Sequence, residues 1–404
     1  MILLRRFIPP AHARSIRYVI REIVLEAEKY ESKTGKKSIR LNIGDPCKFD
    51  FSPPQHAIDA YINALKTRKH FYGDSRGELE LRKAIVEYEK RKNGLSLDVN
   101  DVLVTQGAAE AVNTILAVAF ERGEEILIPS PTYPPYLSAA KFFGVKPIEY
   151  RCIEKDGWKP DIDHMRKLIS QKTKAVIIIN PNNPTGAVYD QKTIKEIVDF
   201  AGENDLLVIS DEIYDFIVYD GIKKSINVAS IAKDVPVITL YSLSKVYLAT
   251  GWRIGYMYKH DPNNQINELW DAMLRFLMVR LSVNTPAQYA AVAALLGPQD
   301  HIRELVNKLQ KRRDFIYKRL NEIEGISTQK PKGAFYIFPK IEVESMSDEE
   351  FCKKLLWETG LVVPPGSGFG VYGAQHFRIV FLPPVNVLED AMDRLEKFMR
   401  KIVK

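Results

Sequence analysis

Residues 242–253 combine a primary amine with side chains that bind phosphate. Ser242 and Ser244 precede Lys245, and Arg253 follows eight residues after the lysine. Hydroxyl and guanidinium groups are phosphate ligands, and a lysine amine beside them can act as a nucleophile. A lysine at the end of a strand is in most proteins a surface residue, so the interpretation depends on these neighbours. Together they indicate a reactive amine next to a phosphate site.

Two further apolar runs end in polar residues that suit a heterocyclic ring. The run 206–211 ends in Asp211, with Tyr214 three residues later, and the run 174–180 leads into the turn NPNNPTG, which contains Asn183. Strands of an open α/β sheet bind ligands at their carboxyl ends, so these side chains should lie together. An aspartate there can pair with a protonated pyridine nitrogen. The combination describes a Schiff-base cofactor with a phosphate and a pyridine ring.

A turn between a strand and a helix supplies a second candidate for phosphate binding. The run 101–105 leads through Gln106 and Gly107 into a helix that begins at Ala108 and Ala109. Small residues at a helix N-terminus allow backbone N–H groups to approach a phosphate. A tight turn with no ligand explains the same residues equally well.

The elements that position these residues follow an alternating pattern between residues 100 and 260. Seven apolar runs are predicted as strands: 101–105, 124–130, 146–150, 174–180, 206–211, 237–242 and 253–258. Amphipathic stretches such as 108–120 separate them and predict helices. Strands this apolar are buried on both faces. We therefore expect an α/β fold whose large domain has a mostly parallel (mixed) seven-stranded sheet flanked by helices.

The C-terminal part predicts a smaller α+β domain. Its expected elements are an amphipathic helix over 301–326, strands over 333–339 and 377–381, and a final helix over 387–403. The predicted division is an N-terminal segment, 1–50, that packs with the small domain, a large cofactor-binding domain, 51–300, and the small domain, 301–404.

The composition argues against several other classes of protein. Of 404 residues, 46% are hydrophobic and 27% charged, and the longest apolar stretches are too short to span a bilayer. The net charge is +7, but basic and acidic residues are interleaved, which favours a solvated surface over a nucleic-acid interface. The N-terminus does not resemble a secretory signal, and the three cysteines are far apart. We expect a cytoplasmic protein without a nucleic-acid or membrane partner.

Three other motifs lack the second element that their chemistry requires. The run LLVISDE resembles a Walker B strand, but the chain has no GxxxxGK[ST] loop, which excludes an ATPase of that type. The glycine-rich stretch 366–373 lacks GxGxxG spacing and opens no helix, so it does not predict a dinucleotide site. The seven histidines are scattered without an HExxH motif, so no metal site is expected.

The ordered motifs of the chain resemble the class I aminotransferase family of pyridoxal-phosphate enzymes. The matching pieces are LNIGDP, FYGDSRGELELR, TQGAAEAV, SPTYPPY, NPNNPTG, SDEIYD, SLSKVYLATGWRIGY and FRIVFL, and they cover almost the whole chain. SLSK followed by arginine and NPTG are highly specific together. The resemblance is closest to archaeal alanine aminotransferases, through LNIGDPCKFDF, FYGDS, SLSKVYLATGWR and GAFYIFPKIEV.

This resemblance implies pyridoxal 5'-phosphate as cofactor and assigns roles around its ring. Lys245 would bind the cofactor covalently and move the substrate Cα proton. Asp211 would hold the ring nitrogen, Tyr214 and Asn183 the ring 3-oxygen, and Tyr133 would stack on the ring face. Tyr133 is also compatible with a purely structural role in the core.

The resemblance assigns the phosphate and the substrate to other residues. The implied phosphate ligands are Ser242, Ser244, Arg253, the backbone of Ala108 and Ala109, and Tyr72 from the partner subunit of a homodimer. Arg378 would bind the substrate α-carboxylate, with Gly44 and Asn183 beside it, although Gly44 is also compatible with a simple turn. Position 109 is alanine where many relatives have a hydroxyl, so only its backbone would serve the phosphate.

The implied activity is ping-pong transfer of an amino group between L-alanine and 2-oxoglutarate. Tyr133, in place of the tryptophan of typical aspartate enzymes, argues against aspartate. Aspartate or aromatic aminotransferases and a pyridoxal-phosphate lyase on the same scaffold remain alternatives. A ligand-sensing regulator would need a DNA-binding module, for which the chain leaves no room. Arg17 and Arg280 are candidates for the distal carboxylate of glutamate.

Overall fold

A mixed eight-stranded sheet forms the centre of the computed structural model, which describes residues 7–14, 16, 18–343 and 345–403. In spatial order the strands are β2 (Val102–Thr105), β9 (Gly255–His260), β8 (Val237–Ser242), β7 (Leu207–Asp211), β6 (Thr173–Ile179), β3 (Glu125–Ser130), β4 (Lys146–Ile153) and β5 (Lys159–Pro160). The strands from β8 to β4 run parallel, while β9 is antiparallel to both neighbours. The predicted α/β class and all seven predicted strands are confirmed.

The eighth strand corrects the predicted count of seven. Strand β5 pairs antiparallel with the end of β4, through Cys152 opposite Pro160 and Ile153 opposite Lys159. Two paired residues are too few to show the alternation of a strand, so the sequence carries no signal for β5.

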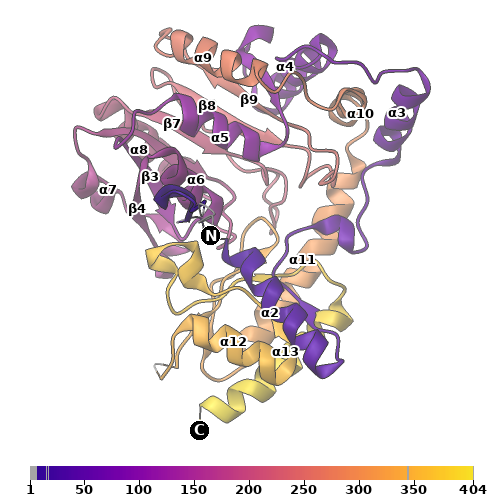
Figure 1. Cartoon of the computed structure of the whole chain (residues 1–404), viewed down its shortest axis with the longest axis vertical. Helices are drawn as coiled ribbons and strands as arrows, with labels where there is room; N and C mark the ends of the chain where they lie inside the picture. The colour runs from indigo at the N-terminus through magenta and orange to yellow at the C-terminus, as the bar shows by residue number, and fades with distance from the viewer. Residues whose placement is uncertain (1–6, 15, 17, 344, 404) are drawn as a thin grey trace, which may run out of the picture.

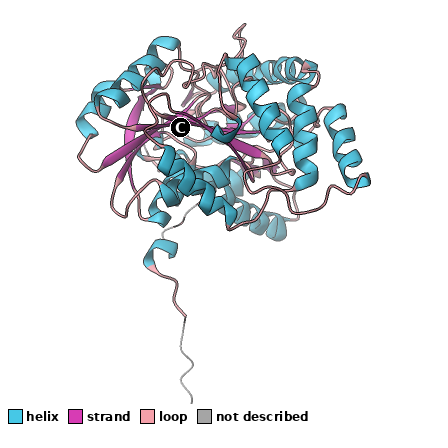
Figure 2. Ribbon diagram, turned by 90° about the horizontal axis from the view of Figure 1, so that it is seen from above, coloured by secondary structure: helices cyan, strands magenta, loops and turns pink. Residues whose placement is uncertain are grey.

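Helices cover both faces of the sheet, as Figures 1 and 2 show. Helices α5 (Ala108–Val118), α6 (Pro134–Phe143) and α9 (Asn267–Met278) share a buried core with alternate strand residues such as Ile177 and Ile209. The intervening residues, such as Val176 and Val208, face a second core. That core includes side chains of α4 (Leu79–Asn93), α8 (Gln191–Glu203) and α10 (Thr285–Leu296). Burial on both faces explains why the strands are apolar throughout rather than alternating.

The C-terminal part consists of helices and short strand pairs below the sheet in Figure 1. Its elements are α11 (Asp300–Asn321), β10 (Ile326–Ser327), β11 (Tyr336–Ile337), β12 (Lys340–Ile341), α12 (Asp348–Thr359), β13 (Leu361–Val362), β14 (Ile379–Val380) and α13 (Val385–Ile402). Strands β10 and β12 pair antiparallel, as do β11 and β14. The strands predicted over 333–339 and 377–381 are therefore present but shorter, because only two residues of each form the ladder.

The N-terminal segment lies against this C-terminal part. Helix α2 (Val19–Thr34) packs its apolar face on α12 and β13, and β1 (Ile39–Arg40) pairs parallel with β13.

Further helices are α1 (Ala11–Arg14), α3 (Gln55–Lys66) and α7 (Ile162–Leu168). The domain limits at residues 50 and 300 stay a prediction.

A buried ionic cluster anchors the segment that follows β7. Lys92 of α4 lies 2.8 Å from a Glu89 oxygen and 3.0 Å from an Asp215 oxygen, and all three side chains are almost fully buried. Burial would lower the pKa of Lys92, but the charges of Asp215 and Glu89 outweigh it and raise that pKa above its usual value. The cluster ties α4 to the stretch that carries Asp211 and Tyr214.

Candidate functional site

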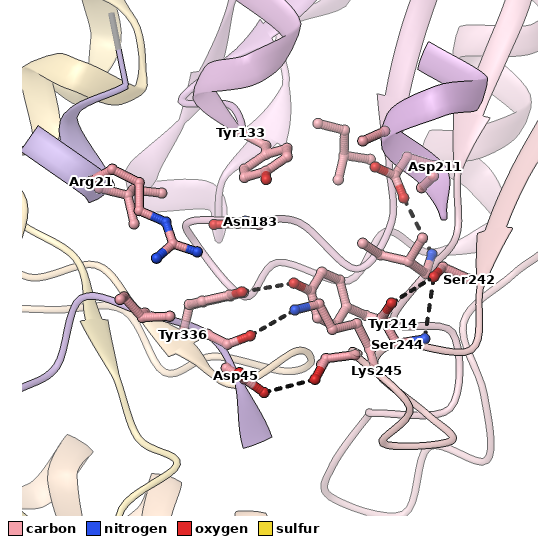
Figure 3. Close-up of a pocket in the computed structure, with 18 of the residues that line it drawn as sticks. Arg21, Asp45, Tyr133, Asn183, Asp211, Tyr214, Ser242, Ser244, Lys245 and Tyr336 are labelled. Atoms are coloured by element: carbon pink, nitrogen blue, oxygen red, sulfur yellow. Dashed lines mark hydrogen bonds between the residues drawn. The ribbon is translucent and has the colours of Figure 1, made fainter. Parts of the chain in front are cut away.

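A cavity of about 560 Å³ opens at the carboxyl edge of the parallel strands. It is bounded by the ends of β6, β7 and β8, by the start of α5, and by the N-terminal and C-terminal parts of the chain. Twelve of the predicted site residues line it: Gly44, Ala108, Ala109, Tyr133, Asn183, Asp211, Tyr214, Ser242, Ser244, Lys245, Arg253 and Arg378. Figure 3 shows how side chains from these separate elements converge.

The amine of Lys245 lies between a backbone carbonyl and an aromatic ring. Its Nζ donates a hydrogen bond to the Gly44 carbonyl oxygen at 2.7 Å and stands 5.4 Å from the ring centroid of Phe335. Burial lowers the pKa of Lys245 to about 8, with the Asp45 carboxylate acting in the opposite direction and Arg378 adding to the effect. About a tenth of the amine is therefore neutral, and nucleophilic, at pH 7, far more than for an ordinary lysine with a pKa of about 10.4.

A buried carboxylate occupies the end of β7. Asp211 is only 4% exposed, and its Oδ2 accepts a hydrogen bond from the Tyr136 hydroxyl at 2.7 Å. Its Oδ1 accepts a longer bond, 3.3 Å, from the Ile213 N–H. Burial raises the pKa of Asp211 to about 6 against the lowering effect of these hydrogen bonds. A cationic partner in the cavity would favour the ionised form.

Hydroxyl groups gather next to Lys245 at the end of β8. The Ser242 hydroxyl donates to the Ser244 hydroxyl oxygen at 2.9 Å, and the Ser244 N–H donates to Ser242 Oγ at 3.2 Å. Both side chains are buried, and both line the cavity. They form one side of a compact set of donors.

The other side of this set is the N-terminus of α5 with the Arg253 guanidinium. Gly107 caps the helix at φ +77°, and a Cβ built on it would lie 2.6 Å from Arg253 Nη2. A side chain there would collide with the guanidinium, so glycine allows the loop and the arginine to approach. The first N–H groups of a helix have no partner within it, which leaves those of Ala108 and Ala109 to face an anion.

A buried arginine on the opposite wall has no carboxylate partner in the described part of the chain. Arg378 is 1% exposed; its Nη1 donates to Asn183 Oδ1 at 3.0 Å and its Nη2 to the Asn42 carbonyl. Among the described residues, no hydrogen-bond partner reaches its Nε. Burying a cation without an anion is costly, so the geometry favours a ligand that carries a negative charge.

Most of the sequence matches the model of a known protein family. The model described as aminotransferase class I and II matches residues 36–395. The chain belongs to this aminotransferase family.

Individual relatives are similar over nearly the whole chain. The structure of alanine aminotransferase from Pyrococcus furiosus is 55% identical, with a TM-score of 0.95, and the match covers 98% of this chain and 100% of that one. Glutamate–pyruvate aminotransferase AlaA of Haemophilus influenzae is 38% identical over 93% of both chains. Aromatic-amino-acid aminotransferase 2 of Thermococcus litoralis is also 38% identical, over 90% of this chain and 92% of its own.

The aminotransferase cavity contains residues that the sequence reasoning missed. Tyr136 holds Asp211, Tyr336 bonds to Tyr214, and Arg21 of α2 lines the cavity. Tyr136 and Tyr336 lie inside the motifs SPTYPPY and GAFYIFP, so their position within matched motifs was a usable signal. Arg21 stands in the first turn of an ordinary amphipathic helix and has no such signal.

Two predicted residues, Tyr72 and Arg280, lie outside this cavity. Tyr72 is 82% exposed and lies outside it. Arg280 does not line it either, because its Nε pairs with Glu110 at 3.0 Å and its Nη2 donates to the Val104 carbonyl. Arg17 lies outside the described residues.

Two kinds of feature are absent from the described residues. They contain no group of three or more His, Cys, Asp or Glu side chains placed to hold a metal ion. None of their helices is long and apolar enough to cross a membrane.

The lowered pKa of Lys245 predicts its reactivity in the protein without bound ligand. Labelling of Lys245 by an amine-specific reagent should rise with pH to a midpoint near 8, whereas an ordinary lysine titrates at about 10.4. Asp45→Asn should move the midpoint lower, since the Asp45 charge stabilises the ammonium form. Peptide mass spectrometry after timed labelling measures both values. A wild-type midpoint above about 10 would contradict the burial argument.

Proposed function

We propose that this aminotransferase uses pyridoxal 5'-phosphate to transfer the amino group between L-alanine and 2-oxoglutarate, giving pyruvate and L-glutamate in two half-reactions. The observation that carries the proposal is one cavity with a depressed lysine pKa, a buried aspartate and a buried arginine without a carboxylate partner among the described residues. The names of the Pyrococcus and Haemophilus relatives support alanine as the amino donor.

The residues of the cavity fit this cofactor. Ser242, Ser244, Arg253 and the first N–H groups of α5 would hold its phosphate, and Asp211 would accept the hydrogen of its ring nitrogen. When bound, pyridoxal phosphate supplies an electron sink for the electrons of the substrate Cα–H bond. A charge-assisted bond from this nitrogen to Asp211 would contribute about 1.5–3 kcal/mol.

Residues on the remaining walls would orient the ring. Tyr133 lines the cavity as a partly buried ring. Asn183 Oδ1 accepts from Arg378, which leaves the Asn183 amide hydrogens for an acceptor in the cavity. Tyr214 presents a buried hydroxyl beside it. These donors suit an oxygen substituent on the ring.

Lys245 and Arg378 would act on the substrate. Arg378 would pair its free guanidinium edge with the α-carboxylate, which fixes the Cα–H bond relative to the lysine. The Lys245 amine has a pKa of about 8 and is mostly neutral above that pH. In its neutral form it would take the proton from Cα and deliver it to the cofactor. Asp211 would stay ionised once a cationic ring nitrogen faces it.

The distal carboxylate of glutamate needs a second cation, and we assign it to Arg21. This side chain is exposed, lines the cavity, and points into it in Figure 3. Among the described residues, no carboxylate forms a salt bridge with it. A long side chain at the rim can approach a distal carboxylate or leave space for the methyl group of alanine. An aromatic substrate is the second candidate, because Tyr18 and Tyr133 also line the cavity.

The covalent attachment can be tested directly. The purified protein should be yellow, and borohydride should fix the mass of pyridoxal phosphate on the peptide that contains Lys245. Lys245→Ala should abolish transamination, since the loss of a positioned acid–base group alone slows a reaction by about 10²–10⁴-fold. Recovery of the label on a different lysine would refute the assignment.

Substrate choice can be tested with a panel of amino acids. With 2-oxoglutarate fixed, kcat/KM for alanine should exceed that for aspartate, tyrosine and leucine. Arg21→Gln should lower kcat/KM for 2-oxoglutarate by about tenfold or more, equivalent to roughly 1.4 kcal/mol, and leave that for alanine nearly unchanged. Arg303→Gln, at an exposed site away from the cavity, is the matched control. A preference of more than about tenfold for aspartate or an aromatic amino acid would reject alanine.

We also propose that the active unit is a homodimer with shared sites. Phe71, Tyr72, Met278, Val279 and Leu281 are large apolar or aromatic side chains that stand exposed. Their segments adjoin, since the Thr285 hydroxyl donates to the Phe71 carbonyl and the Ser75 hydroxyl to that of Leu281. Exposed apolar side chains gathered in this way are typical of a protein–protein interface. Tyr72 would then reach the phosphate of the partner subunit.

Hybrid dimers test this arrangement. A mixture of Lys245→Ala and Tyr72→Phe chains should form dimers in which one site combines an intact Lys245 with an intact Tyr72. At a cofactor concentration too low to saturate Tyr72→Phe, the mixture should be more active than the sum of the two variants. An active monomer in sedimentation would contradict the proposal.

A further inference from the structure

Tyr336 contacts three functional segments of the cavity at once. It belongs to β11, is 2% exposed, and its hydroxyl oxygen lies 2.7 Å from that of Tyr214. The guanidinium carbon of Arg378 stands 4.5 Å from the centroid of its ring. A Cβ built on Gly44 would lie 2.3 Å from the Tyr336 hydroxyl, so only glycine fits against it. The Tyr336 ring therefore packs beside Arg378, the arginine proposed to bind the substrate carboxylate, while its hydroxyl shares a hydrogen bond with Tyr214.

The surroundings of the two phenols indicate which one donates. Burial raises the pKa of Tyr336 to about 12, but the positive charge of Arg378 acts in the opposite direction. Burial also raises the pKa of Tyr214 well above its usual value, and there the neighbouring Tyr336 and the Asp211 charge add to the effect. The phenol beside the cation is the better donor. We therefore assign the shared hydrogen to Tyr336, next to Arg378, which leaves the Tyr214 hydrogen to point elsewhere.

We propose that Tyr336 is a positioning residue that donates to the Tyr214 hydroxyl and thereby directs the Tyr214 hydrogen toward the ring oxygen of the bound cofactor. This role rests on the proposed function, because it requires a cofactor oxygen in the cavity. Tyr336 acts through Tyr214 rather than on the ring, since its own hydroxyl is already engaged. If Tyr336 only filled space, a phenylalanine would serve as well.

The role predicts a change in the charge balance of the cofactor site. With Tyr336 donating to it, the Tyr214 oxygen is held in place and its hydrogen has one preferred direction. Without that donor the Tyr214 hydroxyl can rotate, and an anionic ring oxygen loses part of a charge-assisted hydrogen bond. The deprotonated form of the cofactor site is therefore destabilised relative to the protonated form. The pH midpoint of the cofactor's visible absorption should rise as a result.

Tyr336→Phe is the informative variant, because it keeps the ring over Arg378 and removes only the hydroxyl. In the holoenzyme without substrate, we expect the absorption midpoint to rise by about 0.5–1 pH unit. Tyr214→Phe, which removes the direct donor, should raise it by about 1–2 units. In the Tyr214→Phe background, Tyr336→Phe should add nothing, since its effect passes through Tyr214.

Tyr150→Phe is the matched control. Tyr150 is fully buried and donates to the Ile177 carbonyl at 2.8 Å, outside the cavity, so its loss should not move the midpoint. An unchanged or lowered midpoint in Tyr336→Phe, or a full extra shift in the double variant, would overturn the role of Tyr336. If the wild-type protein binds no cofactor at Lys245, the proposed function fails as well; if it binds and the midpoint stays, only this role fails.

Discussion

A guanidinium group buried without a counter-ion is unfavourable, and the wall of the cavity is built around one. Arg378 has amide and carbonyl oxygens on its Nη atoms and aromatic rings beside its plane, but no salt bridge to a described residue. Neutral ligands hold the guanidinium in position without satisfying its charge. The same charge helps to keep the Lys245 amine neutral. One uncompensated cation thus provides an anion-binding wall and also favours the neutral form of the Lys245 amine.

The segment SDEIYD carries both charges that are paired and a charge that is not. Asp211 and Tyr214 line the cavity, while Asp215, which does not line it, forms an ion pair with Lys92. Glu212 is also buried away from the cavity, where it accepts hydrogen bonds from the Asn227 amide and the Val228 N–H. The paired side resists movement, because separating a buried ion pair is costly. The unpaired side, held by this rigid backing, is left to bind the ligand.

The sequence predicts the residues of the strand ends well and the residues between elements poorly. The sequence predicts that Lys245, Asp211 and Asn183 lie together, because apolar runs mark buried strands and parallel strands end at one edge of a sheet. All three line the cavity. Tyr336 was missed as a site residue because its strand has two residues, and its partner Tyr214 lies 122 positions away. Arg280 is a candidate from the sequence because the distal carboxylate needs a cation, but it lies outside the cavity. Its partner Glu110 is 170 positions away, and no local pattern announces such a pair.

Two of the cationic residues that line the cavity, Arg378 and Arg21, differ in a way that suits a reaction with unlike substrates. Arg378 is fixed by buried neighbours, which fits an α-carboxylate that every amino-acid substrate carries. Arg21 is exposed and lies on α2, whose apolar face packs on the C-terminal part of the chain. Contacts with a small apolar side chain such as that of alanine discriminate by only about 1–3 kcal/mol. A second cation fixed inside the cavity would disfavour alanine, which has no distal carboxylate to pair with it, whereas an exposed cation can stay in solvent when alanine binds. Transfer between alanine and glutamate needs one site to accept both, and a fixed arginine with an adjustable one meets that need.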